Sequence, residues 1–116
     1  MAIRAFLVFI ALGLLGCDSP DYPKGGPHYY ESWASYVAPY RPVGRLTKDD
    51  VSRIENEGGN YYIAYFDGQR RIVSFEQILA GKSLWKVEYE YLVDKRVLEK
   101  TYVEGIYEKE ILLPST

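Results

Sequence analysis

The sequence predicts an α+β domain built on an antiparallel β-meander of about four to six strands with one short helix. Three observations lead to this prediction. The segment "LWKVEYEYLV" at 84–93 alternates apolar and polar residues, which is typical of a strand with one buried face. Asp67-Gly68 stands between two strand-like runs and favours a hairpin. The segment "LTKDDVSRIENEGG" at 46–59 carries helix start and stop signals.

Residues 1–16 precede this domain and have the pattern of a signal peptide. Arg4 is followed by eleven residues without a charge, "AFLVFIALGLL". A helix that spans a bilayer needs about 20 apolar residues, so this run is too short for a stable transmembrane anchor. We therefore expect a signal helix that is absent from the mature protein.

The residues around the only cysteine resemble the lipobox of bacterial lipoproteins. Leu14, Leu15, Gly16 and Cys17 match its pattern, with Leu15 as a tolerated choice. The resemblance implies that the Cys17 thiol receives a diacylglycerol, that cleavage makes Cys17 the first residue, and that its amine is acylated. Two or three acyl chains hold a protein at a membrane essentially permanently. The alternative is a cysteine that follows an apolar helix by chance.

Residues 17–27 are expected to form the lipidated cysteine and a flexible tether, followed by a single domain over 28–116. The segment "DSPDYPKGGP" at 18–27 has three prolines and no hydrophobic periodicity, so it offers little apolar surface to bury. Asp18 resembles the signal that retains bacterial lipoproteins in the inner membrane, and it favours that membrane. The outer membrane stays open.

Within the domain, "HYYESWASYVAPYRPVG" at 28–44 is aromatic, and its prolines suit an edge strand or a bend. Thr47 and Asp50 then predict a capping box, with a helix stop at Gly58 or Gly59. This helix carries only a narrow apolar stripe, so we expect it to cover one edge of the sheet.

The strands that follow are joined by turns at Asp67-Gly68, at "AGKS" and at Asp94-Lys95. On the strand within 84–93, the alternation places one set of residues on a buried face, which is Trp85, Val87, Tyr89, Tyr91 and Val93. Lys86, Glu88 and Glu90 fall on the other face. The segment 96–112 alternates less clearly, and Gly105 indicates a bulge or a break in it. The segments "YFDGQRRIV" and "YLVDKRVLE" look alike, but two weak copies do not define a repeat.

Charge and composition argue against several functions. Without residues 1–16, which contain Arg4, thirteen basic residues remain against sixteen acidic ones. Nucleic acid is therefore not an expected partner, because such proteins show a clustered basic excess. The only histidine, His28, is expected in the tether, directly after Pro27, so neither a catalytic triad nor a metal centre is expected. No cofactor motif occurs.

Tyrosine is the unusual feature, with 12 in the chain. Tyrosine is common on binding surfaces, and it also suits half-buried strands of a small domain. The adjacent pairs are candidates for a binding surface, because neighbouring strand residues point to opposite faces and only one of each pair can be inside. The candidate binding residues are Tyr29, Tyr30, Tyr61 and Tyr62.

The domain also resembles an uncharacterised family of small bacterial proteins that carry a domain of unknown function. The resemblance covers about 29–104. The features that carry it are Pro39, Val43-Gly44, Tyr65-Phe66-Asp67, Arg71, Phe75 and Tyr89-Glu90-Tyr91. It implies no activity.

These observations together predict a lipoprotein of the bacterial cell envelope that acts as a non-enzymatic binding module. It would be held by lipid at the membrane, facing the periplasm or the exterior, and would bind an envelope protein. Two alternatives are a structural accessory of an envelope assembly complex and an inhibitor or immunity lipoprotein.

Overall fold

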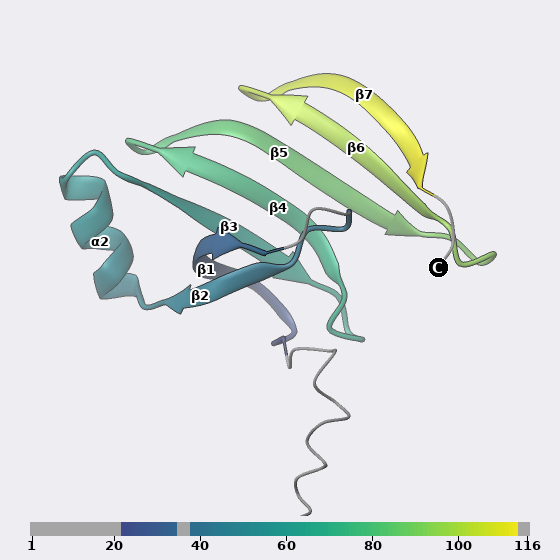
Figure 1. The fold of residues 1–116 in the computed structure, drawn as a ribbon, viewed down its shortest axis with the longest axis horizontal. Helices are drawn as coiled ribbons and strands as arrows, with labels where there is room; N and C mark the ends of the chain where they lie inside the picture. Colours follow the sequence, from purple (N-terminus) through teal and green to yellow (C-terminus); the bar gives the residue numbers. More distant parts are fainter. Residues whose placement is uncertain (1–21, 35–37, 114–116) are drawn as a thin grey trace, which may run out of the picture.

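A computed structural model describes residues 22–34 and 38–113, which form one antiparallel β-sheet of seven strands and one helix. The strands lie in the order β2-β1-β3-β4-β5-β6-β7 (Figure 1). Their bounds are β1 Gly25–Trp33, β2 Pro42–Leu46, β3 Asn60–Phe66, β4 Ile72–Leu79, β5 Lys82–Tyr91, β6 Val97–Val103 and β7 Ile106–Leu113. The helix, α2, spans Lys48–Asn56 and stands between β2 and β3 in the chain.

The sheet has two unlike faces, which we name the core face and the polar face. On the core face, Ala64 pairs with Phe75, Phe75 with Val87, and Val87 with Thr101 across four neighbouring strands. The polar face carries the residues next to these in sequence, such as Glu76 paired with Lys86. Trp85, Val87, Tyr89 and Tyr91 lie on the core face, as the alternation predicted, whereas Val93 lies beyond the end of β5 and is fully exposed.

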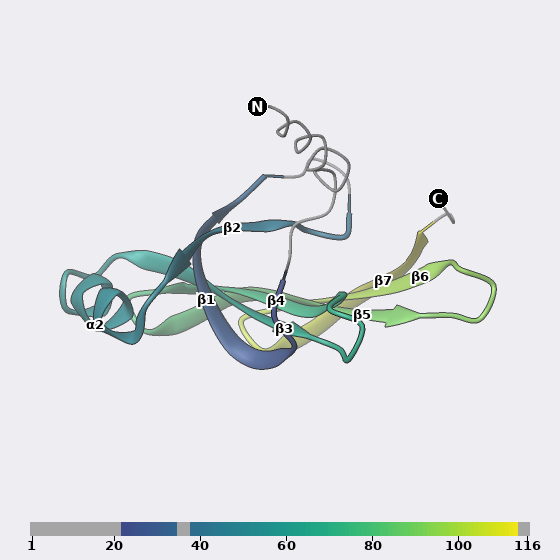
Figure 2. The ribbon, with the colours of Figure 1, turned by 90° about the horizontal axis from the view of Figure 1, so that it is seen from below.

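The core face is covered over only part of its width. In Figure 2, β1 bends away from the sheet and carries β2 over one face of it. The buried cluster beneath this cover contains seven residues, Tyr30, Ala64, Phe66, Ile72, Phe75, Val87 and Tyr89. Phe75 is fully buried between the rings of Tyr40 and Tyr62, whose centroids lie 5.3 and 5.2 Å away. None of these seven residues comes from β6 or β7, although Val97 and Leu113 of those strands pack against the cluster.

The helix begins with the predicted capping box. The side chain of Thr47 accepts a hydrogen bond from the backbone N–H of Asp50 at 3.1 Å, and the Asp50 carboxylate accepts one from the Thr47 N–H at 2.9 Å. These bonds hold the pKa of Asp50 below its ordinary value. Gly58 follows with a positive φ of 71°, the conformation that ends many helices. Figure 1 shows α2 at one end of the sheet.

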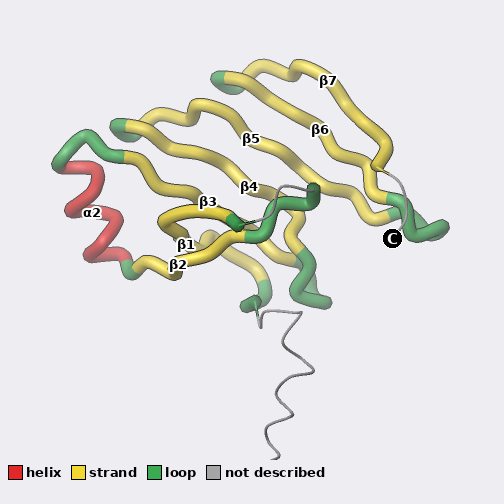
Figure 3. The backbone as a smooth tube through the Cα atoms, viewed as in Figure 1, coloured by secondary structure: helices red, strands yellow, loops and turns green. Residues whose placement is uncertain are grey.

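The turns fall into two kinds, gathered at opposite ends of the sheet (Figure 3). At one end, Ala80-Gly81 and Glu104-Gly105 each have two residues of positive φ, as in tight two-residue hairpins. At the other end, loops 67–71 and 92–96 are longer. In each loop the N–H of the first residue donates to the carbonyl of the last, and the residue before the last, Arg70 or Lys95, has a positive φ. The hairpin at Asp67-Gly68 is therefore confirmed, but positive φ falls at Arg70 rather than at these two residues.

Seven strands exceed the predicted four to six. The segment 96–112, in which Gly105 indicated a bulge or a break, is divided by the Glu104-Gly105 turn into β6 and β7. The proline-containing segment 28–44 holds two strands, with Pro42 at the start of the edge strand β2. The glycine and the prolines indicated where the strands are interrupted. Only the strand pairing on both sides of each interruption shows that two strands form there.

The folded domain also begins earlier than residue 28. The ring of Tyr22 stacks on Phe66 with centroids 4.9 Å apart, and its hydroxyl donates to the carbonyl of Pro42 at 2.8 Å. β1 begins at Gly25. The structure therefore places 22–27, which were expected in the flexible tether, on the folded domain. The signal segment, Cys17 and Asp18 lie outside the described residues.

Candidate binding surface

An open groove of about 370 Å³ lies on the core face beside the cover. β5, β6 and β7 supply most of its lining, and Tyr40 closes the side next to the core. The lining consists of Tyr40, Trp85, Val87, Glu99, Thr101, Val103, Lys109 and Ile111. Val103 and Ile111 are each 41% exposed. A concave, mainly apolar site with a few polar groups is the usual form of a binding site.

Glu99 is the buried charged residue of this groove, only 9% exposed. Its Oε2 accepts a hydrogen bond from the hydroxyl of Tyr89 at 2.7 Å. That hydroxyl accepts one in turn from the backbone N–H of Tyr40 at 3.2 Å. Burial and the bond to Glu99 raise the pKa of Tyr89 far above its ordinary value. The chain of bonds therefore fixes Tyr40, one wall of the groove, to the strands that form its floor.

The ring of Tyr40 also connects the groove to the core. It stacks on Trp85 with centroids 5.5 Å apart and meets Trp33 edge-on at 5.0 Å. Burial raises the pKa of the Tyr40 hydroxyl. Trp85 is half-buried, because its outer surface forms part of the groove. The two rings together make a rigid aromatic wall, a type of surface that is enriched in interfaces.

A second hollow, of about 280 Å³, lies on the polar face and is lined by charged residues. Lys86 contacts Glu88 at 3.5 Å, and the hydroxyl of Tyr102 donates to Glu88 Oε1 at 3.2 Å. The ammonium of Lys86 lies 5.5 Å from the centroid of the Tyr102 ring. Lys86, Glu88 and Tyr102 thus engage one another on a solvated surface, and Glu76 also lines this hollow.

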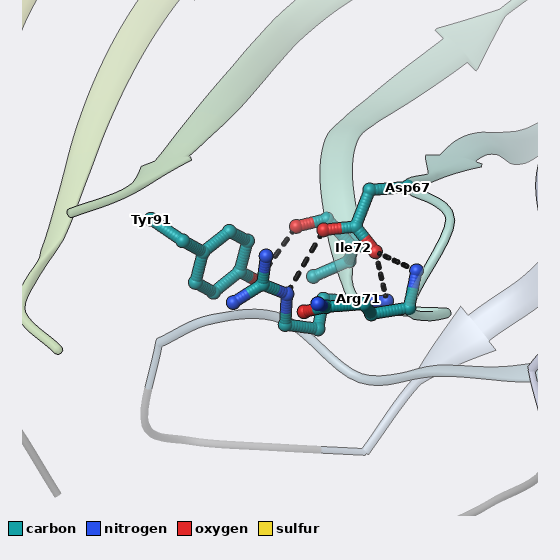
Figure 4. Close-up of polar contacts among 5 residues, drawn as sticks. Asp67, Arg71, Ile72 and Tyr91 are labelled. Atoms are coloured by element: carbon teal, nitrogen blue, oxygen red, sulfur yellow. Dashed lines mark hydrogen bonds and ion pairs between the residues drawn. The ribbon is translucent and has the colours of Figure 1, made fainter. Parts of the chain in front are cut away.

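A third cluster locks the β3–β4 loop (Figure 4). Asp67 Oδ1 accepts from the backbone N–H groups of Gln69 and Arg71, and its Oδ2 accepts from Arg71 Nε, each at 2.9 Å. The Arg71 guanidinium lies 4.2 Å from the centroid of the Tyr91 ring, and the Tyr91 hydroxyl donates to the carbonyl of Ile72 at 2.7 Å. Burial raises the pKa of Tyr91 to about 12. These contacts give Asp67 and Arg71 a structural role.

The four predicted tyrosines do not form one exposed surface. Tyr30 and Tyr61 are each only 4% exposed, and Tyr29 and Tyr62 are half-buried. Tyr30 faces the core, while the hydroxyl of Tyr61 donates to Glu55 of α2 at 2.5 Å. Tyr62 packs against the core cluster, so both members of the second pair are packed, on opposite faces of β3. Because both sides of β1 and β3 are partly covered, these tyrosines contribute more to packing than to a free surface.

His28, expected in the tether, lies instead in β1. Its Nδ1 accepts from the guanidinium of Arg45 at 2.9 Å, and its Nε2 contacts the carbonyl of Lys24 at 3.1 Å. Within 22–34 and 38–113, no group of three His, Cys, Asp or Glu residues could hold a metal ion. Over the same ranges, no helix has the length and hydropathy needed to cross a membrane.

Comparison with models of known protein families, with curated proteins and with solved structures found no match to this chain. The groove and its exposed border on β7 are the structural features that bear on function. Sequence reasoning missed them, although one signal was present. In "VLEKTYV" at 97–103, Glu99 occupies the same face as Val97, Thr101 and Val103, so a single acid interrupts an apolar face.

Proposed function

We propose that this protein is a lipid-anchored lipoprotein of the bacterial cell envelope whose folded domain is a non-enzymatic binding module for an envelope protein. The observation that carries the binding part is the groove beside β7. It joins a rigid aromatic wall to exposed valine and isoleucine side chains, and it is open to solvent. Such a surface supplies apolar area for a partner without the paired catalytic groups that an enzyme requires.

The non-enzymatic part rests on the pairing of the acids. Glu99 is the buried acid of the described residues, and it accepts a hydrogen bond from Tyr89. A glycosidase-like mechanism requires a second acid across the cleft, whereas the other charged residue of the groove is Lys109. Glu88 on the polar face is engaged by Lys86 and Tyr102. The groove is therefore better suited to binding than to acid–base chemistry.

The anchor part rests on the lipobox resemblance at Leu14–Cys17. Cys17→Ala is expected to leave an uncleaved precursor that carries no lipid. Mass spectrometry of the mature chain and flotation with membranes test this expectation. A Cys17→Ala chain that still matures to the wild-type mass and floats with membranes would contradict the anchor.

The binding part is tested by a pair of matched substitutions in the lipoprotein. Val103 borders the groove and is 41% exposed, while Val43 on β2 is 39% exposed and does not line the groove. A tagged Val103→Arg chain should lose the proteins captured by the wild type from detergent-solubilised membranes. Val43→Arg should retain them. Equal capture by all three chains, each with an intact fold, would exclude the groove as the binding surface.

A further inference from the structure

β7 is the exposed edge of the sheet. No strand pairs with its outer side within the described residues, and its side chains are exposed on both faces, from Ile106 at 69% to Ile111 at 41%. The opposite edge, β2, is short, begins with Pro42 and is folded over the core face. Edges are usually shielded by such devices. β7 has charges only in its middle, at 108–110, and its last three residues are apolar.

The backbone bonding of β6 shows which groups of β7 face outward. The N–H of Glu104 donates to the carbonyl of Leu84, and that of Leu92 donates to the carbonyl of Arg96. Because alternate residues of an antiparallel strand bond to opposite neighbours, the even-numbered residues of β6 bond to β5 and the odd-numbered ones to β7. Glu99 then bonds to its partner Ile111. Glu110 and Leu112 are left with backbone groups that point to the open edge.

We propose that β7 pairs antiparallel with β7 of a second copy, about a two-fold axis that passes between the two Ile111 side chains. In this register Glu110 lies opposite Leu112 of the second copy, so the outward backbone groups of these residues meet their counterparts. On the core face, Ile111 meets Ile111, and Lys109 lies opposite Leu113. No like charges stand directly opposite each other, and the apolar end of each strand is covered.

The neighbouring registers are poorer. An axis at Glu110 sets the two Glu110 carboxylates opposite each other, and an axis at Lys109 does the same to the two ammonium groups. Like charges directly opposite are destabilising. An axis at Leu112 would pair only one of the two outward-facing residues within β7, because Glu110 would lie opposite Pro114, beyond the end of the strand. Only the register at Ile111 pairs both Glu110 and Leu112 with residues of the second β7 and places no like charges opposite each other.

The geometry also suits two lipid anchors, a point that rests on the proposed function. A two-fold axis perpendicular to the sheet leaves the core faces of both copies on the same side. Tyr22 packs on that face of each copy, against Phe66, and is five residues from Cys17. Both Cys17 residues could then reach one membrane, whereas a contact that inverted one copy would separate them.

Disulfide trapping in the full-length lipoprotein, purified in detergent, tests the register. Residues opposite each other in a non-hydrogen-bonded antiparallel pair have Cα atoms about 4.5 Å apart, close enough for a disulfide. Ile111→Cys should therefore form a covalent dimer on oxidation, and Val43→Cys on the opposite edge should not. No dimer from Ile111→Cys, or equal dimer from Val43→Cys, would overturn the proposal. A disulfide in the unsubstituted chain would come from a free Cys17, and would contradict the lipid anchor rather than the strand pairing.

A charge exchange gives a second measurement that does not depend on a thiol. Leu112→Glu places a carboxylate opposite Glu110 of the second copy and should convert the dimer to monomer in sedimentation analysis. Adding Glu110→Lys to the same chain sets an introduced ammonium group opposite an introduced carboxylate at both symmetry-related positions, and should restore the dimer. Circular dichroism checks that each variant is folded. A wild-type chain that is monomeric at every concentration would reject this register. A double variant that is folded but remains monomeric, as the Leu112→Glu chain does, would also reject it.

Discussion

At the scale of single residues, the hydroxyl of Tyr89 makes two hydrogen bonds inside the domain. It donates to the buried carboxylate of Glu99 and accepts from the N–H of Tyr40. Tyr89→Phe leaves both groups without this partner, and an unsatisfied buried polar group costs about 1–3 kcal/mol. We therefore expect the free energy of unfolding in urea to fall by about this amount. Tyr102→Phe is the matched control, because its bond to Glu88 is longer, at 3.2 Å, and lies on the solvated polar face.

A loss in Tyr89→Phe no larger than that in Tyr102→Phe would mean that water replaces the Tyr89 hydroxyl. The double variant Tyr89→Phe with Glu99→Leu provides a further check. Since it removes the buried carboxylate together with its donor, it should recover part of the stability lost in the single variant.

The same scale shows where sequence reasoning succeeded. The capping pair Thr47 and Asp50 was predictable because both partners lie within one turn of helix and need no information about the rest of the fold. Trp85 and Val87 were placed on the buried face for a similar local reason. The role of Glu99 was not predictable, because its partner Tyr89 is ten residues away in sequence and meets it only when β5 and β6 pair.

At the scale of elements, the two longer hairpin loops share a backbone form but differ in their side-chain support. Asp67 bonds two backbone N–H groups and Arg71, which in turn covers the Tyr91 ring. In the other loop, Asp94 bonds to the N–H and side chain of Arg96 on an exposed surface. The similarity of "YFDGQRRIV" and "YLVDKRVLE" thus reflects two hairpins of the same form. The backbone bonds of the two loops match when Asp67 is aligned with Leu92. This alignment differs by one residue from the one in which the two sequences look alike.

This difference gives a prediction for Asp67→Asn. Burial acts to raise the pKa of Asp67, but the hydrogen bonds from Arg71 and Gln69 outweigh it, so its pKa lies below the ordinary value. A carboxyl group with a lowered folded-state pKa stabilises the fold above its unfolded-state pKa, about 3.9, and this stabilisation is lost as pH falls through the folded-state value.

Asp67→Asn should therefore reduce the free energy of unfolding by about 1–2 kcal/mol at pH 7. The gap from the wild type should close in acid, below about pH 4. Urea titrations at several pH values measure both effects. Asp94→Asn should cost less, because its loop does not cover an aromatic ring. A gap that stays constant from pH 7 to pH 2 would mean that the Asp67 charge does not stabilise the loop.

At the scale of the whole molecule, the position of Tyr22 limits how far the domain can stand from a membrane. An extended chain spans at most about 3.6 Å per residue, so the five residues from Cys17 to Tyr22 reach no more than about 18 Å. Tyr22 packs on the core side of the sheet, against Phe66 and Tyr30. If Cys17 carries the proposed lipid, the groove side of the sheet should face the bilayer, closer than a flexible tether over 17–27 would hold it.

Adjacent residues of β7 provide a matched measurement of this orientation. Lys109 pairs with Thr101 on the core face, and Glu110 pairs with Lys100 on the polar face. A donor dye on Lys109→Cys of the mature lipoprotein in vesicles should transfer more energy to acceptor-labelled lipid headgroups than the same dye on Glu110→Cys. The two dyes project from opposite faces of one strand, so their distances to the headgroups should differ by about 10 Å, the spacing of packed sheet layers. Lengthening the segment between Cys17 and Tyr22 with a Gly-Ser linker should lower transfer at both sites and reduce their difference, because a longer flexible chain relaxes the orientation. Greater transfer from position 110 would place the polar face toward the membrane, and equal transfer with the native spacing would show that Tyr22 does not orient the domain.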